Sequence, residues 1–561
     1  MAVLLILGVV AFIGLFTLCA LSLGEYIARV LARKTHGFFE RKIYALVGIN
    51  YEQEMSWKHY AFSFVFLSFV GIAFLFFLQE IQQWLPFNPE HFGPVRWDTA
   101  INTAISFVTN TNWQAYAGES TLSYFTQMVG CTVQNFLSAA MSIAFCIACI
   151  RAFTRRSTSK IGNFWVDLTR TIMYVLLPLS CIFALVLVSQ GVIQNLNPAT
   201  HVSTLEGTEQ IIAQGPAASQ VAIKHIGTNG GGFFAANAAH PFENPTPLTD
   251  ILHILAFLLI PAAFPFVLGK LLGSRKQGFA LYLTMLTLYL GGLAFALWSE
   301  TNGNLLLSRV GVAHGCNMEG KEVRFGLISS TVFAHATTAT SCGAVNASHD
   351  SFMPLTNMIL LFNMMVGEVI FGGAGVGLIG MLLYAILTMF IMGLMIGRTP
   401  EIFGKKLEPY EMIMAIIAVL APSMIKLLLG ALAISTKMGT EGLVNTGPHG
   451  LATIMYAFSS TAGNNGSAFA GLASNTLFYN FTTAIAMLVG RFALIIPSLA
   501  LAGSLIQKRF TPEVSRFPTT SPLFVIILIC TVLILGALTF FPVLVLESVL
   551  EHVMIRIGQT F

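Results

Sequence analysis

The sequence predicts an all-α membrane protein that crosses the bilayer ten times. Three observations support this fold class. Hydrophobic residues make up 55% of the 561-residue chain and charged residues only 10%, whereas soluble globular proteins carry about 25% charged residues. The apolar residues are gathered into ten runs, each long enough to cross about 30 Å of hydrocarbon. The basic residues are concentrated in alternate connections between these runs.

The ten apolar runs follow one another from one end of the chain to the other. They fall near residues 2–24, 60–79, 122–150, 171–191, 251–272, 279–298, 354–397, 411–434, 477–505 and 522–546. No basic residue precedes the first run, and it is long enough to span. We therefore expect it to be a transmembrane helix rather than a cleaved signal peptide.

Lysine and arginine side chains predict the orientation of these spans. The connections after the first, third, fifth, seventh and ninth runs hold 20 of the 29 lysines and arginines, counted in and beside them. Connections rich in lysine and arginine stay on the cytoplasmic side. With ten spans, both termini are then expected outside.

The seventh run, 354–397, is too long for one crossing, because as one straight helix it would extend about 66 Å. Two crossings would break the alternation of basic loops. Between residues 369 and 380 the chain contains Gly372, Gly373, Gly375, Gly377 and Gly380, which disfavour a continuous helix. We therefore expect one broken crossing with a re-entrant loop, since irregular backbone at membrane depth survives only inside protein or beside water. The alternative is a plain surface of small residues for helix packing.

Four of the outward connections share one pattern, a short semi-apolar stretch that ends in a cluster of small polar residues. These stretches are 98–114, 218–232, 326–346 and 450–468, and their clusters are spaced by 118, 113 and 123 residues. The chain therefore repeats one unit four times: a span, a dipping helix, an extended turn and a second span. We assign the repeats to 60–150, 171–272, 279–397 and 411–505, and extra spans to 1–24 and 522–546. Such repetition predicts four pseudo-symmetric units around one axis.

The four polar clusters have the composition of a cation selectivity filter. The predicted filter consists of Asn110, Thr111 and Asn112; Thr228, Asn229 and Gly230; Ser341, Cys342 and Gly343; and Asn464, Asn465 and Gly466. Backbone carbonyl oxygens that converge on an axis can replace the hydration shell of an ion. Such a backbone needs residues with positive φ, which glycine adopts freely and asparagine tolerates, so Asn112 is expected to replace glycine in the first copy. None of the twelve residues is acidic, which favours potassium over a more strongly hydrated cation.

Further residues are expected at the edges of this filter. Gly231 and Gly232 continue the second turn, and Gln114 follows the first turn. Gln114 is expected either at the outer edge of the filter or in a hydrogen bond to a dipping helix. His225 and His335 precede filter turns, and we interpret both as packed side chains, because neither has metal-ligand spacing with another histidine.

Arg491 lies in the middle of the ninth run, where a charge is costly unless it faces a wet cavity or a partner. We expect it to act below the filter, as an electrostatic barrier or as a partner of the glycine-rich segment. The alternative is a structural ion pair with Glu368, the carboxylate of the seventh run. Lys426 is also near the middle of its run, but its side chain is long enough to snorkel to an interface.

The sequence resembles a known family along essentially its whole length. The strings that carry this resemblance are NTNWQAYAGE (110–119), GTNGGGFFAANAAHPFENPTPL (227–248), NMEGKEVRFG (317–326), TSCGAVN (340–346), MIGRTPEIFGKK (395–406) and AGNNGSAF (462–469). They are similar to the potassium-binding A subunit of the bacterial Kdp potassium-uptake P-type ATPase, in the superfamily of potassium transporters. The first copy departs from glycine at its third position, where Asn112 stands.

The resemblance implies a subunit of the bacterial cytoplasmic (inner) membrane that binds extracytoplasmic potassium. A separate P-type ATPase B subunit, which binds ATP and Mg²⁺, then takes the ion up, and a C subunit and a small F subunit complete the complex. The resemblance also implies that Gly372, Gly373, Gly375 and Gly377 form, with Arg491, the gate that blocks straight passage of the ion below the filter. Potassium is the only ion, and no organic cofactor is implied for this chain. The residues agree, because neither an aspartyl-phosphate motif DKTGT nor a phosphate-binding G-x-x-x-x-G-K-[ST] motif occurs in the sequence.

Two alternatives remain open at this point. A self-sufficient passive potassium channel or transporter of the same superfamily would share the filter and the eight repeat spans. The two extra spans, the glycine-rich break and the whole-chain strings favour the pump subunit. An organic-solute carrier is less favoured, since such carriers use broken helices in inverted pairs, and the repeats here all begin on the cytoplasmic side.

Overall fold

The computed structural model describes every residue except 1, 310, 312–316, 368, 511–516 and 560–561. Within these described residues, ten helices are long and apolar enough to cross a membrane, as predicted. The spans are built from α1 (Ala2–Ala32), α3 (Trp57–Glu80), η2 with α6 (Thr126–Thr132, Val133–Thr154), α7 with η3 and α8 (Phe164–Arg170, Thr171–Leu176, Leu177–Ser189), α10 (Pro247–Leu271), α11 (Arg275–Thr301), α15 (Val376–Ile396), α16 (Pro409–Ser435), α19 (Leu477–Leu505), and α20 with η7 and α21 (Pro522–Leu544, Val545–Val549, Leu550–Ile557).

The two outermost spans are longer than expected. α1 continues past residue 24 to Ala32, and the last span continues past residue 546 through a π-helical turn to Ile557. Both added segments carry charged residues, which an apolar-run criterion excludes. Both spans therefore continue as amphipathic helix beyond the apolar stretch that hydropathy detects.

Several spans begin at a proline preceded by a capping residue. The Thr246 hydroxyl accepts a hydrogen bond from the Thr249 amide at 3.1 Å, just before Pro247 at the start of α10. Ser521 in the same way accepts from the Phe524 amide, just before Pro522. Proline suits the first helical turn because its missing N–H would have no intrahelical partner there.

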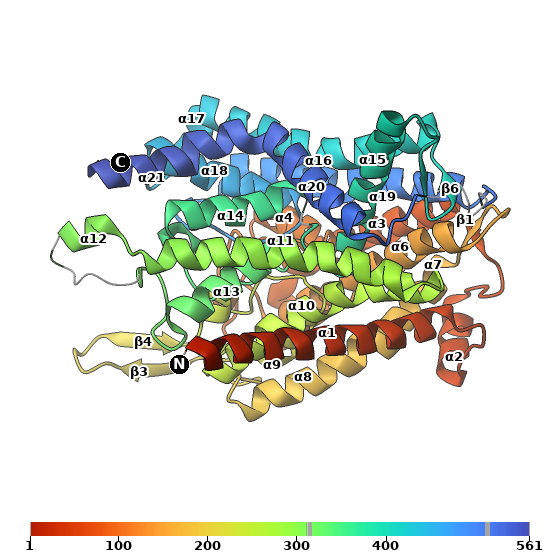
Figure 1. The fold of residues 1–561 in the computed structure, drawn as a ribbon. Helices are drawn as coiled ribbons and strands as arrows, with labels where there is room; N and C mark the ends of the chain where they lie inside the picture. Colours follow the sequence, from red (N-terminus) through yellow and green to blue (C-terminus); the bar gives the residue numbers. More distant parts are fainter. Residues whose placement is uncertain (1, 310, 312–316, 368, 511–516, 560–561) are drawn as a thin grey trace.

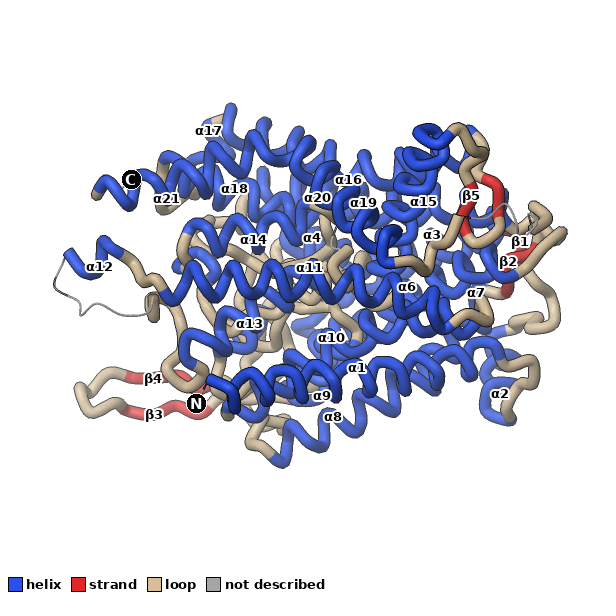
Figure 2. The backbone as a smooth tube through the Cα atoms, in the orientation of Figure 1, coloured by secondary structure: helices blue, strands red, loops and turns tan. Residues whose placement is uncertain are grey.

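Short elements connect the spans at the two ends of the helix bundle. The short helices are α2 (Phe38–Val47), η1 (Gln82–Trp84), α5 (Gly118–Thr121), η4 (Asn237–Ala239), α12 (Leu305–Arg309), η5 (His349–Ser351) and α17 (Lys437–Thr440). The strands form two-stranded antiparallel pairs: β1 (Met55–Ser56) with β2 (Lys160–Gly162), β3 (Thr200–Ser203) with β4 (Glu209–Ile212), and β5 (Glu401–Ile402) with β6 (Lys405–Lys406). Figure 2 shows that all strands lie outside the helical bundle.

The two chain ends lie at the same end of the bundle as the β3–β4 hairpin, the N-terminus beside this hairpin and the C-terminus on the far side (Figure 1). α2, β1 and β6 lie at the opposite end, where the basic connections gather. This arrangement agrees with an even number of crossings.

The seventh span is broken, as the glycines predict. α14 (Pro354–Met365) ends before the glycine-rich segment, and α15 begins at Val376. The described residues between them, 366–367 and 369–375, are called the gate loop here, after the role predicted for their glycines. They are anchored by Phe371. The Phe371 ring is fully buried and lies 6.3, 6.0 and 5.6 Å from the rings of Phe16, Tyr282 and Tyr289.

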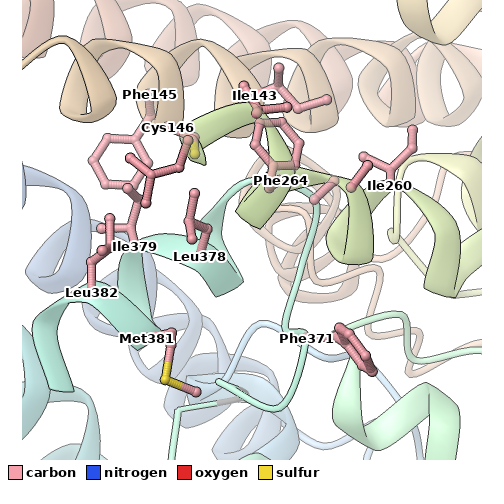
Figure 3. Packing of buried hydrophobic residues seen from close by; sticks show 14 of the residues in the cluster. Ile143, Phe145, Cys146, Ile260, Phe264, Phe371, Leu378, Ile379, Met381 and Leu382 are labelled. Carbon is pink, nitrogen blue, oxygen red and sulfur yellow. The ribbon is translucent and has the colours of Figure 1, made fainter. Parts of the chain in front are cut away.

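The main apolar core surrounds the start of α15. Figure 3 shows Leu378, Ile379 and Leu382 of α15 close to the α6 residues Phe145 and Cys146. Such close packing fixes where the gate loop leaves and re-enters helical structure.

Candidate functional site

Each of the four predicted dipping segments forms a short helix that ends at a filter turn. These helices are α4 (Trp97–Val108), α9 (Ala217–Ile226), α13 (Gly326–Ala339) and α18 (Gly447–Ala462). The last carbonyl groups of a helix carry a partial negative charge. Four such ends therefore favour a cation at the place where the turns meet.

The four turns have the same alternating backbone. The first residue of each has a positive φ, namely Asn110 (66°), Thr228 (50°), Ser341 (56°) and Asn464 (56°), and so has the third, namely Asn112 (55°), Gly230 (70°), Gly343 (79°) and Gly466 (94°). Most L-residues avoid this conformation. Its repetition in all four turns shows that one local fold is used four times. Asn112 adopts the positive φ predicted for it.

Contacts between neighbouring turns place them in a ring that follows chain order. The Asn110 side-chain amide donates to the Thr228 carbonyl at 3.0 Å, which joins the first turn to the second. The Ser341 hydroxyl donates to the Asn464 carbonyl at 3.0 Å, and the Asn464 amide donates to the Thr111 hydroxyl at 2.9 Å. The third turn is thus joined to the fourth, and the fourth to the first.

The third-position glycines lie against the next turn in the ring. A Cβ atom added to Gly230, Gly343 or Gly466 would overlap the carbonyl oxygen of Cys342, Asn465 or Thr111, respectively. The second and third turns are therefore also in direct contact. The twelve predicted filter residues are all buried and come together in one place.

Asn112 stands where the other three turns have glycine, and its side chain has partners on α6 and in the second turn. Its amide donates to the Asn135 side chain at 2.8 Å and to the Gly230 carbonyl at 2.9 Å. Asn135 lies on α6 and is fully buried. The ring is therefore only pseudo-symmetric, since only the first turn carries a side chain at its third position, and this side chain bonds to the second turn.

Gln114 bridges the outer parts of the first and second turns. Its side chain donates to the Gly232 carbonyl at 3.0 Å and accepts from the Gly232 amide at 2.8 Å. It also donates to the Tyr116 hydroxyl at 3.3 Å. These hydrogen bonds join Gln114 to the second turn rather than to a dipping helix.

The sequence reasoning missed a buried ion pair behind the second turn. Lys224 of α9 is 1% exposed and pairs with the fully buried Glu243. The Lys224 ammonium also donates to the Gly231 carbonyl at 2.8 Å and to the Asn237 side chain at 3.0 Å. The sequence offered one signal for this ion pair, a lysine within the second dipping stretch. That lysine indicates an ion pair only once Glu243 is known to lie beside it.

The gate loop lies directly below the ring. The Ala374 amide donates to the Thr228 hydroxyl at 2.9 Å, and the Gly372 amide donates to the Ala339 carbonyl at 2.8 Å. A Cβ atom added to Gly373 would lie 3.3 Å from Cβ of Ser341. The predicted gate glycines Gly372 and Gly373 therefore contact the filter region, whereas Gly375 and Gly377 pack at the start of α15.

A cavity of about 60 Å³ lies between the ring and the gate loop. Its lining includes Asn110, Ser341, Gly373, Lys426 and Arg491. This volume is enough for a few water molecules. Two basic side chains, those of Lys426 and Arg491, therefore border this cavity.

Arg491 of α19 is held at the cavity by α6. Its guanidinium donates to the Ser142 hydroxyl at 2.7 Å and to the Ser138 carbonyl at 3.2 Å. The alternative partner Glu368 lies outside the described residues. Within the described residues, Nε of Arg491 has no hydrogen-bond partner.

Lys426 does not snorkel to an interface. Its side chain is fully buried, and its ammonium donates to the carbonyls of Met364 and Met365 at 2.8 and 3.1 Å. These are the last carbonyls of α14, which a cation stabilises. Lys426 therefore caps the half-helix that leads into the gate loop.

The two histidines of the dipping helices differ. His335 bonds to the Tyr289 carbonyl at 2.9 Å, as expected for a packed side chain. His225 instead lies against His253, with ring centroids 4.1 Å apart. Sequence spacing did not indicate this pair, because His253 belongs to the next span. Among the described residues no group of three or more potential metal ligands was found.

His449 links the outer end of α18 to two other parts of the chain. Its ring nitrogens lie 2.7 Å from Asp350 Oδ1 and 2.9 Å from Glu551 Oε1. Burial alone would lower the pKa of His449, but the hydrogen bonds and charges of both carboxylates raise it to about 10. The protonated imidazole thus joins the third turn region, the fourth dipping helix and the last span.

We expect the stability of the protein to fall as the pH rises toward about 10. The protonated form of His449 is favoured in the folded state, so its contribution is fully present below about pH 6.5 and is lost as pH rises through the folded pKa. Thermal unfolding in detergent, measured across this range, should show a smaller pH dependence for His449→Gln. An equal dependence in both proteins would contradict the role of His449.

The ten spans and the ring of four turns define a class, that of polytopic membrane proteins. The fold is similar to the crystal structure of the potassium transporter TrkH from Vibrio parahaemolyticus, with a TM-score of 0.53 at 14% identity, over 86% of this chain and 95% of that one. The family model described as "Potassium-transporting ATPase A subunit" matches residues 10–553, and the chain belongs to this family.

Curated relatives are similar to this chain over nearly its whole length. A potassium-transporting ATPase potassium-binding subunit of Herpetosiphon aurantiacus is 49% identical, over 97% of this chain and 99% of the relative. Proteins of the same name from Paramagnetospirillum magneticum and Serratia proteamaculans are each 51% identical, over 99% and 97% of both chains, respectively.

Proposed function

We propose that this chain binds potassium from the extracytoplasmic side in the ring of four turns and passes it to a separate P-type ATPase subunit for ATP-driven uptake. The observation that carries this proposal is the ring itself, four neutral turns with the same alternating backbone in mutual contact. Backbone oxygens in such a ring can replace the hydration shell of a weakly hydrated monovalent cation. The four helix ends directed at the ring favour positive charge there.

The source of energy belongs to another chain in this proposal. The relatives are named as subunits of a potassium-transporting ATPase, whereas this sequence has no phosphate-binding or aspartyl-phosphate motif. We propose that the ATPase B subunit binds ATP and Mg²⁺ and that a C subunit and a small F subunit complete the complex. The proposed location is the bacterial cytoplasmic membrane, with the basic end of the bundle inside and both termini outside.

The reconstituted complex should hydrolyse ATP in response to potassium. In Gly230→Asp, the new side chain would overlap Cys342 and add a carboxylate to a neutral ring. We expect the half-maximal potassium concentration to rise more than about tenfold, which corresponds to about 1.4 kcal/mol. The measurement is ATPase activity against potassium concentration. An unchanged potassium dependence would place the binding site elsewhere, and rubidium flux through this chain alone without ATP would favour the passive alternative.

The gate loop and Arg491 are proposed to block straight passage to the cytoplasm. A loop that donates hydrogen bonds to Thr228 and Ala339 obstructs the axis below the ring. A buried guanidinium beside the same cavity repels a second cation.

Arg491→Gln tests this gate. We expect a passive potassium leak in proteoliposomes without ATP and a lower ratio of ions transported to ATP hydrolysed, because the positive charge below the ring is removed. Lys426→Met is the matched variant, since it removes the other cation at the cavity and also the cap of α14. Tight coupling in Arg491→Gln, with no leak, would assign Arg491 a purely structural role.

A further inference from the structure

An apolar groove on the outside of the bundle runs between α11 and α20, which pack side by side (Figure 1). The groove encloses about 670 Å³ and is bordered on one side by Leu21 of α1. Its walls include Phe279 and Leu283 of α11 and Ile526 of α20, which are 48%, 42% and 57% exposed. Side chains of this kind suit hydrocarbon better than water.

Two basic residues stand at one end of the groove. Arg275 and Lys276 begin α11 and are both exposed. Arg275 forms an ion pair with Glu25 of α1 at 2.6 Å, although its side chain remains 76% exposed. Lys276 adds a second positive charge, so this end of the groove is net positive and attracts an anionic group.

The length of the groove indicates what occupies it. Along α11 it extends from Lys276 to Thr287, which is about 17 Å at 1.5 Å per residue. One leaflet of the hydrocarbon core is about 15 Å thick. A transmembrane helix of a partner subunit would need a groove about twice as long. A lipid acyl chain needs one leaflet only.

We propose that this groove binds an anionic phospholipid, with one acyl chain between α11 and α20 and the phosphate at Lys276 and Arg275. Given the orientation proposed above, this lipid belongs to the inner leaflet, where a surface cation contributes about 1 kcal/mol to the binding of an anionic lipid. The site is separate from the ring of turns. A lipid bound there contacts α1 and the last span, which are the two spans outside the repeats, and also α11 of the third repeat.

The test uses the intact complex in phosphatidylcholine nanodiscs that contain a phosphatidylglycerol with a photoreactive acyl chain. After irradiation, lipid-modified peptides are identified by mass spectrometry. We expect labelling within 279–287 and 522–529. Lys276→Gln should reduce this labelling about fivefold, the ratio that corresponds to one surface cation, and Leu283→Trp should abolish it by filling the groove.

Lys58→Gln is the matched control, because Lys58 is an exposed lysine at the start of α3, at the same end of the bundle. It should leave the labelling at 279–287 unchanged. A photoreactive phosphatidylcholine should label these peptides weakly in the wild type. The proposal is overturned if both lipids label equally, if Lys276→Gln has no effect, or if a protein subunit protects these peptides. Potassium-stimulated ATPase activity of the same samples reports separately on the proposed function.

Discussion

Gly343→Ala is expected to weaken potassium binding by more than about tenfold while the helical bundle still assembles. Gly343 has φ +79°, and an added Cβ atom would overlap the Asn465 carbonyl of the next turn. A positive φ costs an L-residue about 1–2 kcal/mol. Ser341 and Asn112 nevertheless adopt a positive φ in the same ring, so this cost alone does not prevent the turn from forming. The overlap therefore decides the outcome, because it must displace a backbone carbonyl of the ring.

The measurement for Gly343→Ala is potassium binding to the purified complex by calorimetry, together with a thermal unfolding curve. Gly291→Ala is the matched control, since Gly291 lies in α11 and an added Cβ atom would meet nothing within 4 Å. It should leave both quantities unchanged. If Gly343→Ala binds potassium as tightly as the wild type, the ring is not the binding site.

Glu243→Gln is expected to lower both stability and potassium affinity. The substitution keeps the shape of the side chain but leaves the Lys224 ammonium buried without its counter-charge. Removing one partner of a buried ion pair costs about 3–5 kcal/mol. The uncompensated ammonium also donates to the Gly231 carbonyl, directly after the predicted filter residue Gly230, so it should repel a cation in the ring.

Two variants separate these effects. In the double variant Lys224→Met with Glu243→Gln, no unpaired charge remains. The unfolding temperature should therefore recover, and the affinity should recover with it, because the ammonium that repels a cation in the ring is gone. Glu300→Gln is the matched control: Glu300 pairs with Lys321 at 3.1 Å, both fully buried, away from the ring. It should lose stability but keep the affinity. Equal affinity loss in Glu300→Gln and Glu243→Gln would show that the effect of Glu243→Gln is only a general loss of folding.

Much of the fold was predictable from local sequence alone. Long apolar runs must become helices in a bilayer because every backbone polar group has to be satisfied internally, so the ten spans followed from hydropathy. The break before Val376 followed from the conformational freedom of glycine. The positive φ of Asn112 followed from comparing the four turns within the chain.

The tertiary structure alone decided which residues meet. The pairing of Lys224 with Glu243 joins segments whose separation carries no periodic signal. The repeat spacing predicts that the four turns meet, but it does not specify the bond from Asn110 to Thr228. The contact of His225 with His253 and the capping of α14 by Lys426 are of the same kind. Periodicity in a sequence reports how one segment meets its surroundings. Contacts between segments depend on how the helices pack, and this is why the ion pair behind the second turn was missed.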